Sequence, residues 1–258
     1  MSPDFRARRR VLWTVGSLLA VVLLVAGTWI VVDDHDNDAA EGPTDAVSIP
    51  SPSIGPPPGP TGAAVVVDFA TTRSLRDVPA ARTLESGRNS RPMAVEQGAL
   101  RHGNPTGTDA ASYIELPLPR PVTRLGLTAA FPRTGGFVAA VAFDGSVVDA
   151  MAARRTFPYA GIHFVADDHT WDLGVFDPEI GANTIARGEW TRPDGGDGPV
   201  AFEINRTGSV LTVTLPDGRR SSVADPRVGA WTGRWATWEL YEPRPGVTPA
   251  AITSMWAS

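Results

Sequence analysis

The sequence predicts an all-β protein, an antiparallel β-sandwich over residues 63–258 that is preceded by one transmembrane helix. After residue 62, short runs of Val, Ile, Thr, Phe, Tyr and Trp alternate with clusters of Gly, Pro, Asp and Asn. No segment there sustains a helical period, and the best case, Val147–Arg155, is at most a two-turn helix. Strands at this spacing without alternating helices pack as two antiparallel sheets. A third observation, an uncharged N-terminal run, predicts the helix.

Residues 1–10 are a basic tail and residues 11–32 a membrane-spanning segment. The segment contains 22 residues and no charge. A helix of that length is about 33 Å long, which is enough to cross the hydrocarbon core of a bilayer. Four arginines precede it and an aspartate-rich stretch follows it, so the positive-inside rule places the N-terminus in the cytoplasm and residues 33–258 outside. We expect a signal anchor in the cell membrane, with the lipid bilayer as the partner of residues 11–32.

A cleaved signal peptide is the alternative for this segment. The apolar run is longer than the region of about 7–15 residues that secretory signals carry, and no small-x-small cleavage site follows it directly. An uncleaved anchor is therefore favoured.

Residues 33–62 are a proline-rich linker. They contain seven prolines, and their few apolar residues show no period. Proline-rich chain favours the extended polyproline conformation, at about 3.1 Å per residue. We expect this disordered linker to hold the domain that follows away from the membrane.

The clearest strand of the domain is residues 209–215. Leu211, Val213 and Leu215 share one face and two threonines the other, which is the period of a half-buried strand. Pro216-Asp-Gly218 supplies a turn, so residues 219–223 are expected as the return strand of a hairpin. The other expected strands are 63–69, 93–100, 112–116, 122–131, 137–144, 162–166, 170–176, 184–190, 200–205, 234–242 and 252–256.

Composition excludes several classes of function. The basic residues are all arginine, and residues 33–258 carry 19 of them against 27 acidic residues, a net charge of about −8. Nucleic acid is therefore not expected as a partner, since binding it usually requires a basic excess. Cysteine is absent, which excludes disulfides, zinc–thiolate sites and thiol nucleophiles. The domain must rely on its hydrophobic core for stability.

Five short stretches in the C-terminal half carry a family resemblance. Together they resemble single-pass envelope proteins of actinobacteria, whose outer domain is similar to the concanavalin A-like, or laminin G-like, jelly roll. The resemblance covers residues 63–258 and implies a fold that serves lectins, glycoside hydrolases, lyases and adhesion modules. The stretches are Gly161–Phe164, Trp171–Val175, Leu211–Gly218, Asp225–Arg227 and Trp235–Glu239.

The sequence offers no catalytic motif. Glycosidases similar to this family carry a Glu-x-Asp-x-(x)-Glu run on one strand, and none occurs here. Among the nearest acidic residues, Asp172 and Asp177 are separated from Glu179 by Pro178, which breaks the strand. There is also no Gly-x-Ser-x-Gly motif of a serine hydrolase. No catalytic residue is assigned, and an enzyme is disfavoured.

Residues 167–172 form the first candidate binding site. Lectins of this architecture bind calcium through loop carboxylates and stack sugars on aromatic rings; Asp167 and Asp168 would hold the metal, and Trp171 with Asp172 would contact the ligand. The alternative is that the aspartates form a hairpin turn. Trp171 would then begin the next strand and face the core together with Leu173.

The second candidate is one face of the strand expected at residues 234–242. Trp235, Thr237, Glu239 and Tyr241 share its more polar face, which suits contact with a ligand. The alternative is that these aromatic side chains fill the core.

Three functions remain open. The first is a membrane-anchored, extracytoplasmic recognition or scaffolding module that binds envelope polysaccharide or an extracytoplasmic protein. The second is a polysaccharide-active hydrolase or lyase whose carboxylates lie on separate strands. The third is a structural accessory domain of a cell-envelope complex. An open aromatic groove without paired acids favours the first, and two carboxyl groups about 5–9 Å apart in a cleft favour the second.

Overall fold

The computed structural model describes residues 62–86, 92–102, 110–131, 137–152, 160–177, 181–193, 195–242 and 250–258. The expected spanning segment at 11–32 and nearly all of the linker lie outside these residues. Within the described part, no helix is long and apolar enough to cross a membrane.

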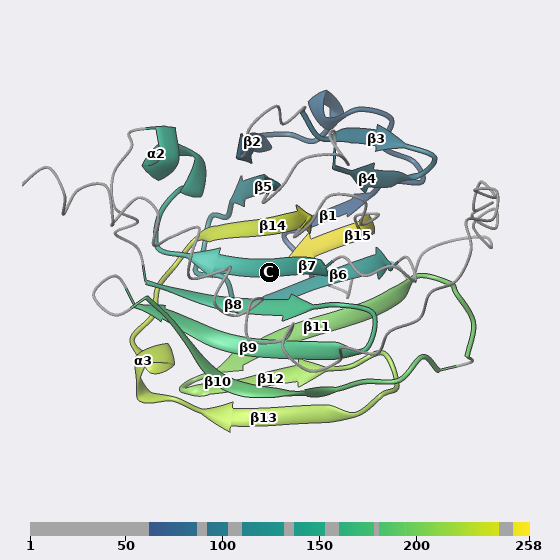
Figure 1. Ribbon diagram of the computed structural model, residues 1–258. Helices are drawn as coiled ribbons and strands as arrows, with labels where there is room; N and C mark the ends of the chain where they lie inside the picture. Colours follow the sequence, from purple (N-terminus) through teal and green to yellow (C-terminus); the bar gives the residue numbers. More distant parts are fainter. Residues whose placement is uncertain are drawn as a thin grey trace, which may run out of the picture.

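The described residues form two antiparallel sheets packed face to face, as the sequence predicted (Figure 1). Sheet A has the order β13-β12-β11-β6-β15-β4-β3, with β1 also paired to β15, and sheet B the order β10-β9-β8-β7-β14-β5-β2. The strands of sheet A are β1 (Val65–Asp68), β3 (Ala94–Glu96), β4 (Ala99–Arg101), β6 (Arg124–Ala130), β11 (Val200–Thr207), β12 (Val210–Thr214), β13 (Arg220–Ala224) and β15 (Ala251–Ala257). Those of sheet B are β2 (Arg82–Ser86), β5 (Ala110–Pro117), β7 (Phe137–Phe143), β8 (Gly161–Ala166), β9 (Thr170–Asp177), β10 (Gly181–Glu189) and β14 (Trp235–Glu242).

Within the part of the chain that the structure describes, helical structure is confined to three short segments. A 3-10 turn covers Leu75–Asp77, and the helices are α2 (Val147–Ala152) and α3 (Pro226–Gly229). Asp225 caps α3 by accepting a hydrogen bond from the Arg227 amide at 2.9 Å, and proline opens the helix. The short helix that the sequence allowed near residue 147 is α2.

Two strand predictions need correction. The stretch expected as one strand at 93–100 is a hairpin of β3 and β4, because Gln97 and Gly98 have φ angles of 52° and 75°. Two successive residues with positive φ reverse the chain. Strand β2 was not predicted, since Leu84 is its one aliphatic side chain and the strand pairs only with β5.

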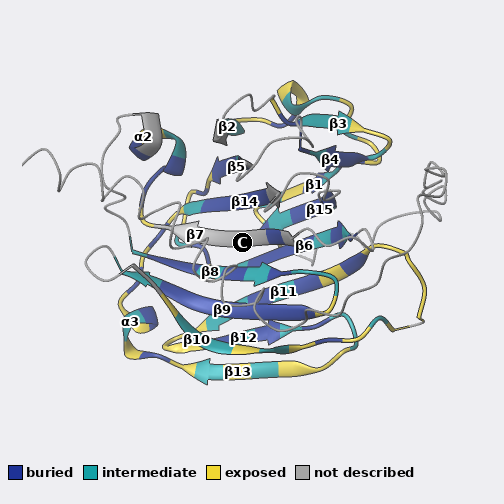
Figure 2. Ribbon diagram, in the orientation of Figure 1, coloured by how far each residue is buried: buried dark blue, intermediate teal, exposed yellow. Residues whose placement is uncertain are grey.

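The core lies between the sheets, and Figure 2 shows β9 buried along most of its length. Trp238 of β14 is fully buried, and its indole Nε1 donates to the carbonyl of Gly126 in β6 at 3.2 Å, which links the two sheets. Phe202 of β11 packs against Phe164 of β8 with ring centroids 5.3 Å apart. Each such fully buried side chain contributes about 1.5–3 kcal/mol, so the core stabilises this domain without disulfides.

Candidate functional site

The outer face of sheet B, directed away from sheet A, carries polar side chains in two rows across the strands. Trp238 and Leu240 point into the core, so Thr237 and Glu239 point outward. The first row runs Tyr113, Glu239, Ala139, Val165, Asp172 and Arg187 across β5, β14, β7, β8, β9 and β10. The second runs Arg82, Glu115, Thr237, Val141, His163, Gly174 and Thr184 from β2 to β10.

Several buried polar atoms on this face have no hydrogen-bond partner. They are Oγ1 of Thr237, Oε1 of Glu239 and both carboxylate oxygens of Asp172. The exposed fractions of these residues are 0%, 4% and 4%. Buried polar atoms in proteins are nearly always paired, so several unpaired atoms on one face indicate a place where a polar ligand completes them.

Burial changes the protonation of Glu239. It raises the pKa of this carboxyl to about 7, while a hydrogen bond from Tyr113 acts in the opposite direction. Near neutral pH the group is therefore present both as a carboxylic acid, which donates a hydrogen bond, and as a carboxylate, which only accepts.

Asp172 lies in the same row as Glu239. Burial raises its pKa, and both Thr184 and Arg187 lower it in part. The contact with Arg187 is long, 4.0 Å from Nε to Oδ2, and neither carboxylate oxygen reaches hydrogen-bond geometry. Thr184 and Arg187 thus stabilise the carboxylate only in part, and burial dominates its pKa.

His163 lies flat against the neighbouring strand, over Gly174. A Cβ atom at position 174 would lie 2.2 Å from Cε1 of the imidazole, so only glycine leaves room for the ring. Burial lowers the pKa of His163 to about 4. The ring is therefore neutral at physiological pH, with one nitrogen able to donate a hydrogen bond and one able to accept.

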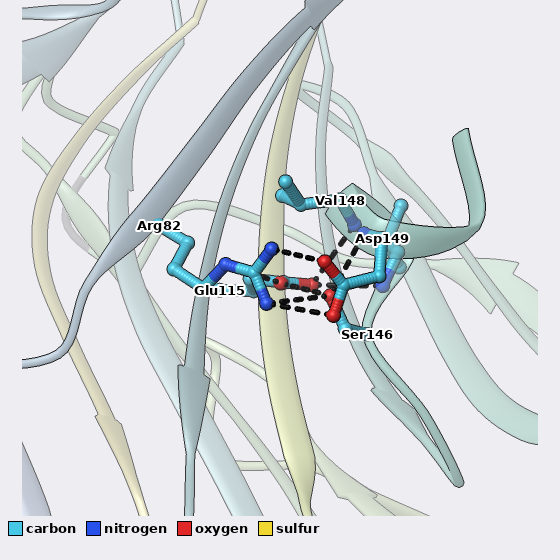
Figure 3. Close-up of polar contacts among 6 residues, drawn as sticks. Arg82, Glu115, Ser146, Val148 and Asp149 are labelled. Atoms are coloured by element: carbon cyan, nitrogen blue, oxygen red, sulfur yellow. Dashed lines mark hydrogen bonds and ion pairs between the residues drawn. The ribbon is translucent and has the colours of Figure 1, made fainter. Parts of the chain in front are cut away.

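Glu115 closes one end of the face and holds α2 (Figure 3). Its carboxylate is fully buried and accepts hydrogen bonds from Oγ of Ser146 at 2.5 Å and from the amides of Val147 at 2.8 Å and Val148 at 3.3 Å. Nε of Arg82 lies 3.7 Å away. These contacts use both oxygens, so Glu115 positions the start of α2 and is not free to react with a ligand.

Arg82 connects this cluster to the aromatic end of the face. Its guanidinium donates to both carboxylate oxygens of Asp149, at 2.5 and 2.9 Å (Figure 3). The Cζ atom also lies over the ring of Trp235, 5.8 Å from its centroid. Trp235 is half-buried and so keeps part of its ring accessible beside the polar rows.

The predicted ligand-binding residues separate into two groups. Glu239, Asp172 and Trp235 lie on the outer face of sheet B, and the backbone of Tyr241 places it on the same face in register with Phe137. Trp171 instead points into the core and is 4% exposed. The sequence predicted that Trp171 and Asp172 belong to one ligand-binding site. Adjacent residues of a strand point to opposite faces, so the two side chains cannot share a site.

Asp167 and Asp168 form the turn between β8 and β9. Asp167 accepts hydrogen bonds from the Thr170 amide at 2.5 Å and its hydroxyl at 2.6 Å, and Asp168 contacts Nδ1 of His169 at 2.7 Å. One ligand atom from each of Asp167, Asp168 and His169 lies within 4.8 Å of the other two. The hydrogen bond from the Thr170 amide to the side chain of Asp167 is typical of a turn. Calcium binding at these residues stays a prediction.

Spacing decides whether the acids could hydrolyse a glycoside. Glu239 and Asp172 are three strand spacings apart, about 14 Å, whereas glycosidase carboxyls lie about 5–9.5 Å apart. Glu115 is a diagonal neighbour of Glu239, at about 7–8 Å, but it is held by α2. Among the described acids of this face, no free pair has hydrolytic spacing.

A buried serine–histidine pair lies elsewhere. Oγ of Ser112 is 3.2 Å from Nδ1 of His102, and the residues are 0% and 7% exposed. Because both are enclosed, this pair offers no accessible nucleophile.

Sequence reasoning missed Tyr113, Glu115 and His163 as members of this face. The alternation of Tyr113-Ile-Glu-Leu116 was a signal, because its polar residues occupy one side of the strand. The proximity of Tyr113 and Glu115 to Glu239 depends on the pairing of β5 with β14, which brings together residues more than 100 positions apart, whereas His163 joins the face through the pairing of β8 with β7.

Comparison with known proteins establishes the fold. The chain matches no protein-family model and no curated protein. It resembles the Bacillus licheniformis β-glucanase, with a TM-score of 0.51, 10% identity, and coverage of 77% of this chain and 99% of that one. It also resembles the Ca2+/Man3GlcNAc-bound exoplasmic/lumenal domain of VIP36, with a TM-score of 0.51, 11% identity, and coverage of 69% of this chain and 83% of that one. For the carbohydrate recognition domain of Emp47p the TM-score is 0.50 and the identity 13%, with coverage of 74% of this chain and 92% of that one. The predicted antiparallel β-sandwich is confirmed, and at these identities the likeness extends to the fold alone.

Proposed function

We propose that this chain is an extracytoplasmic carbohydrate-recognition module that binds a neutral glycan on the outer face of sheet B. The observation that carries the proposal is the group of unpartnered buried atoms on Thr237, Glu239 and Asp172. Sugar hydroxyls both donate and accept hydrogen bonds, so successive units of one oligosaccharide can reach Thr237 and Glu239 at one end and Asp172, about 14 Å away, at the other. Recognition sites commonly combine a few such polar groups with apolar surface.

The edges of the face suit the apolar side of a sugar. Trp235, Tyr113 and His163 are half-buried, so parts of their rings face outward beside the buried polar atoms. An aromatic ring packs against the C–H surface of a pyranose. Carbohydrate recognition by other proteins of this fold supports the same assignment.

A titration of the full chain in lipid nanodiscs tests this proposal. The probes are a β-1,3-1,4-glucan tetrasaccharide, Man3GlcNAc and envelope polysaccharide, and the measurement is isothermal calorimetry. Thr237→Val is expected to weaken binding of the active probe about tenfold, because one hydrogen bond of about 1–1.5 kcal/mol is lost. Thr212→Val is the matched control, since Thr212 lies on sheet A and bonds to Ser222 at 2.8 Å. Equal affinities of the two variants, or no binding of any probe by folded protein, would contradict the proposal.

Hydrolysis is the second candidate, and the pKa of Glu239 favours it. A carboxyl that titrates near 7 suits a general acid. Against it stands the absence of a free partner at hydrolytic spacing among the described acids. Release of reducing ends that Glu239→Gln abolishes would support this alternative, and binding without turnover would support recognition.

We further propose that residues 11–32 anchor the module in the cell membrane with the N-terminus inside, and that residues 33–62 form its stalk. The uncharged run and the arginines before it support this topology. The chain is expected in the carbonate-resistant membrane fraction, and external protease should digest the β-domain while sparing an N-terminal tag. Val21→Arg should reduce membrane retention, because a central arginine costs about 2.5–3.5 kcal/mol. Release of the chain by carbonate, or loss of the tag, would contradict the topology.

A further inference from the structure

A cavity of about 510 Å³ lies on the outer face of sheet A, on the opposite side of the sandwich from the proposed site. Four strands supply its floor, and the loop between β10 and β11 supplies one wall. Its lining includes Trp256, Glu203, Thr128, Ser254, Thr214 and Pro199.

Strand register explains why these side chains meet. One row runs Trp256, Gly126, Glu203 and Thr214 across β15, β6, β11 and β12, and the next runs Ser254, Thr128 and Ala201. The indole of Trp256 lies over Gly126, where a Cβ atom would be 2.1 Å from Cε2 of the ring. Glycine at position 126 therefore allows a half-exposed aromatic ring to lie flat in the sheet surface.

Two charged side chains, Glu203 and Arg192, line the cavity, and Glu203 forms an ion pair with Arg124. Oε1 of Glu203 accepts hydrogen bonds from Nε of Arg124 at 3.1 Å and from its NH2 at 2.7 Å. Oε2 of Glu203 accepts none from the described residues and remains available. Ser254 donates to Oγ1 of Thr128 at 2.9 Å, which leaves the Thr128 hydroxyl proton free to be donated. The cavity thus presents hydrogen-bonding groups, and the guanidinium of Arg192 in its wall is bonded to backbone carbonyls.

Arg192 holds the wall in place. Its NH1 donates to the carbonyls of Gly198 at 2.8 Å and Gly196 at 3.3 Å, its NH2 donates to Phe131 at 3.4 Å, and Cζ lies 5.8 Å from the Trp190 ring centroid. A wall fixed before binding loses less conformational freedom when a ligand enters.

We infer that this cavity is a second carbohydrate site, which takes one neutral hexose unit. A free carboxylate oxygen and adjacent hydroxyls suit a ligand rich in hydroxyl groups. Cζ of Arg124 lies over the ring of Trp256, 5.2 Å from its centroid, and the part of the half-exposed ring that remains accessible supplies the apolar contact. The inference does not rest on the site of sheet B. Two sites on opposite faces would let one module join two glycan chains, with avidity above that of either site.

The test follows the indole N–H of Trp256 by NMR in the full chain in nanodiscs, assigned by Trp256→Phe. With Man3GlcNAc or the β-1,3-1,4-glucan tetrasaccharide, this signal is expected to shift and saturate. Thr128→Val should weaken binding at this signal about five- to tenfold, because it removes one hydroxyl with little change in shape. The Thr212→Val control should leave the affinity unchanged, since Thr212 lies outside the cavity on the same face.

Independence from sheet B is tested by Thr237→Val, which should leave the titration of Trp256 unaltered. A shift that Thr237→Val abolishes would overturn the inference, since it would originate at the other site. No shift with either sugar would also overturn it. So would a shift caused only by a synthetic peptide of residues 50–61, because the cavity would then be a proline-rich peptide site.

Discussion

Replacement of Glu115 by alanine is expected to lower the free energy of unfolding by about 3–5 kcal/mol, because the donors at the start of α2 lose their buried acceptor at about 1–3 kcal/mol each. The carboxylate is fully buried and accepts three hydrogen bonds from the start of α2. Without it, two amides and the Ser146 hydroxyl lose their acceptor, and Arg82 keeps only Asp149 as an ionic partner. Guanidinium denaturation followed by circular dichroism measures the difference.

Two further variants make this result interpretable. Glu115→Gln retains one acceptor oxygen but adds an amide next to backbone donors, so a loss of about 1–3 kcal/mol is expected. Glu96→Ala removes an exposed carboxyl and should change stability by less than about 0.5 kcal/mol. If Glu115→Ala is no more destabilising than Glu96→Ala, Glu115 does not hold α2 as described.

Glu239→Gln is expected to change how the stability of the domain depends on pH. The pKa of Glu239 is raised from about 4.5 to about 7 in the folded protein. Its stabilisation, about 3 kcal/mol, is therefore fully present below pH 4.5 and is lost as the pH rises through 7. The pKa of His163 is lowered from about 6.5 to about 4. Its contribution of similar size is present above pH 6.5 and is lost as the pH falls through 4.

These two contributions oppose each other between pH 4.5 and 6.5. Glu239→Gln removes the stabilisation that the wild type gains when Glu239 is protonated, and it keeps the loss caused by His163. This variant should therefore lose stability relative to the wild type as the pH falls from 7 to 4.5. His163→Gln should behave in the opposite way and gain relative stability over the same interval. Differences between denaturation midpoints at matched pH measure both slopes, since contributions of other groups cancel. Parallel profiles for the wild type and both variants would show that neither group is titrated as inferred.

The alternation of apolar and polar residues along short segments was enough to predict most strands and the face of β14 that carries part of the candidate site. Leu211 and Val213 face the core as their period required, and Trp235 shares a face with Glu239. The hairpin of β3 and β4 was missed because Gln97 and Gly98 interrupt an otherwise continuous run by backbone conformation alone. The rest of the site could not be predicted, because which strand lies beside β14 is decided by packing of the whole sandwich.

The pairing of β1 with β15 sets the order in which the molecule can be completed. Val65 is in register with Ala257, and β15 also pairs with β6 and β4 (Figure 1). Strand β15 therefore connects sheet A, although it is synthesised after all the strands that it pairs with. A chain synthesised from its N-terminus exposes the free edges of β1 and β6 until residues 251–257 arrive. Pairing across so long a separation is slow, and open edges invite association with other strands. The edges of β1 and β6 therefore stay open to association with other strands until β15 pairs with both.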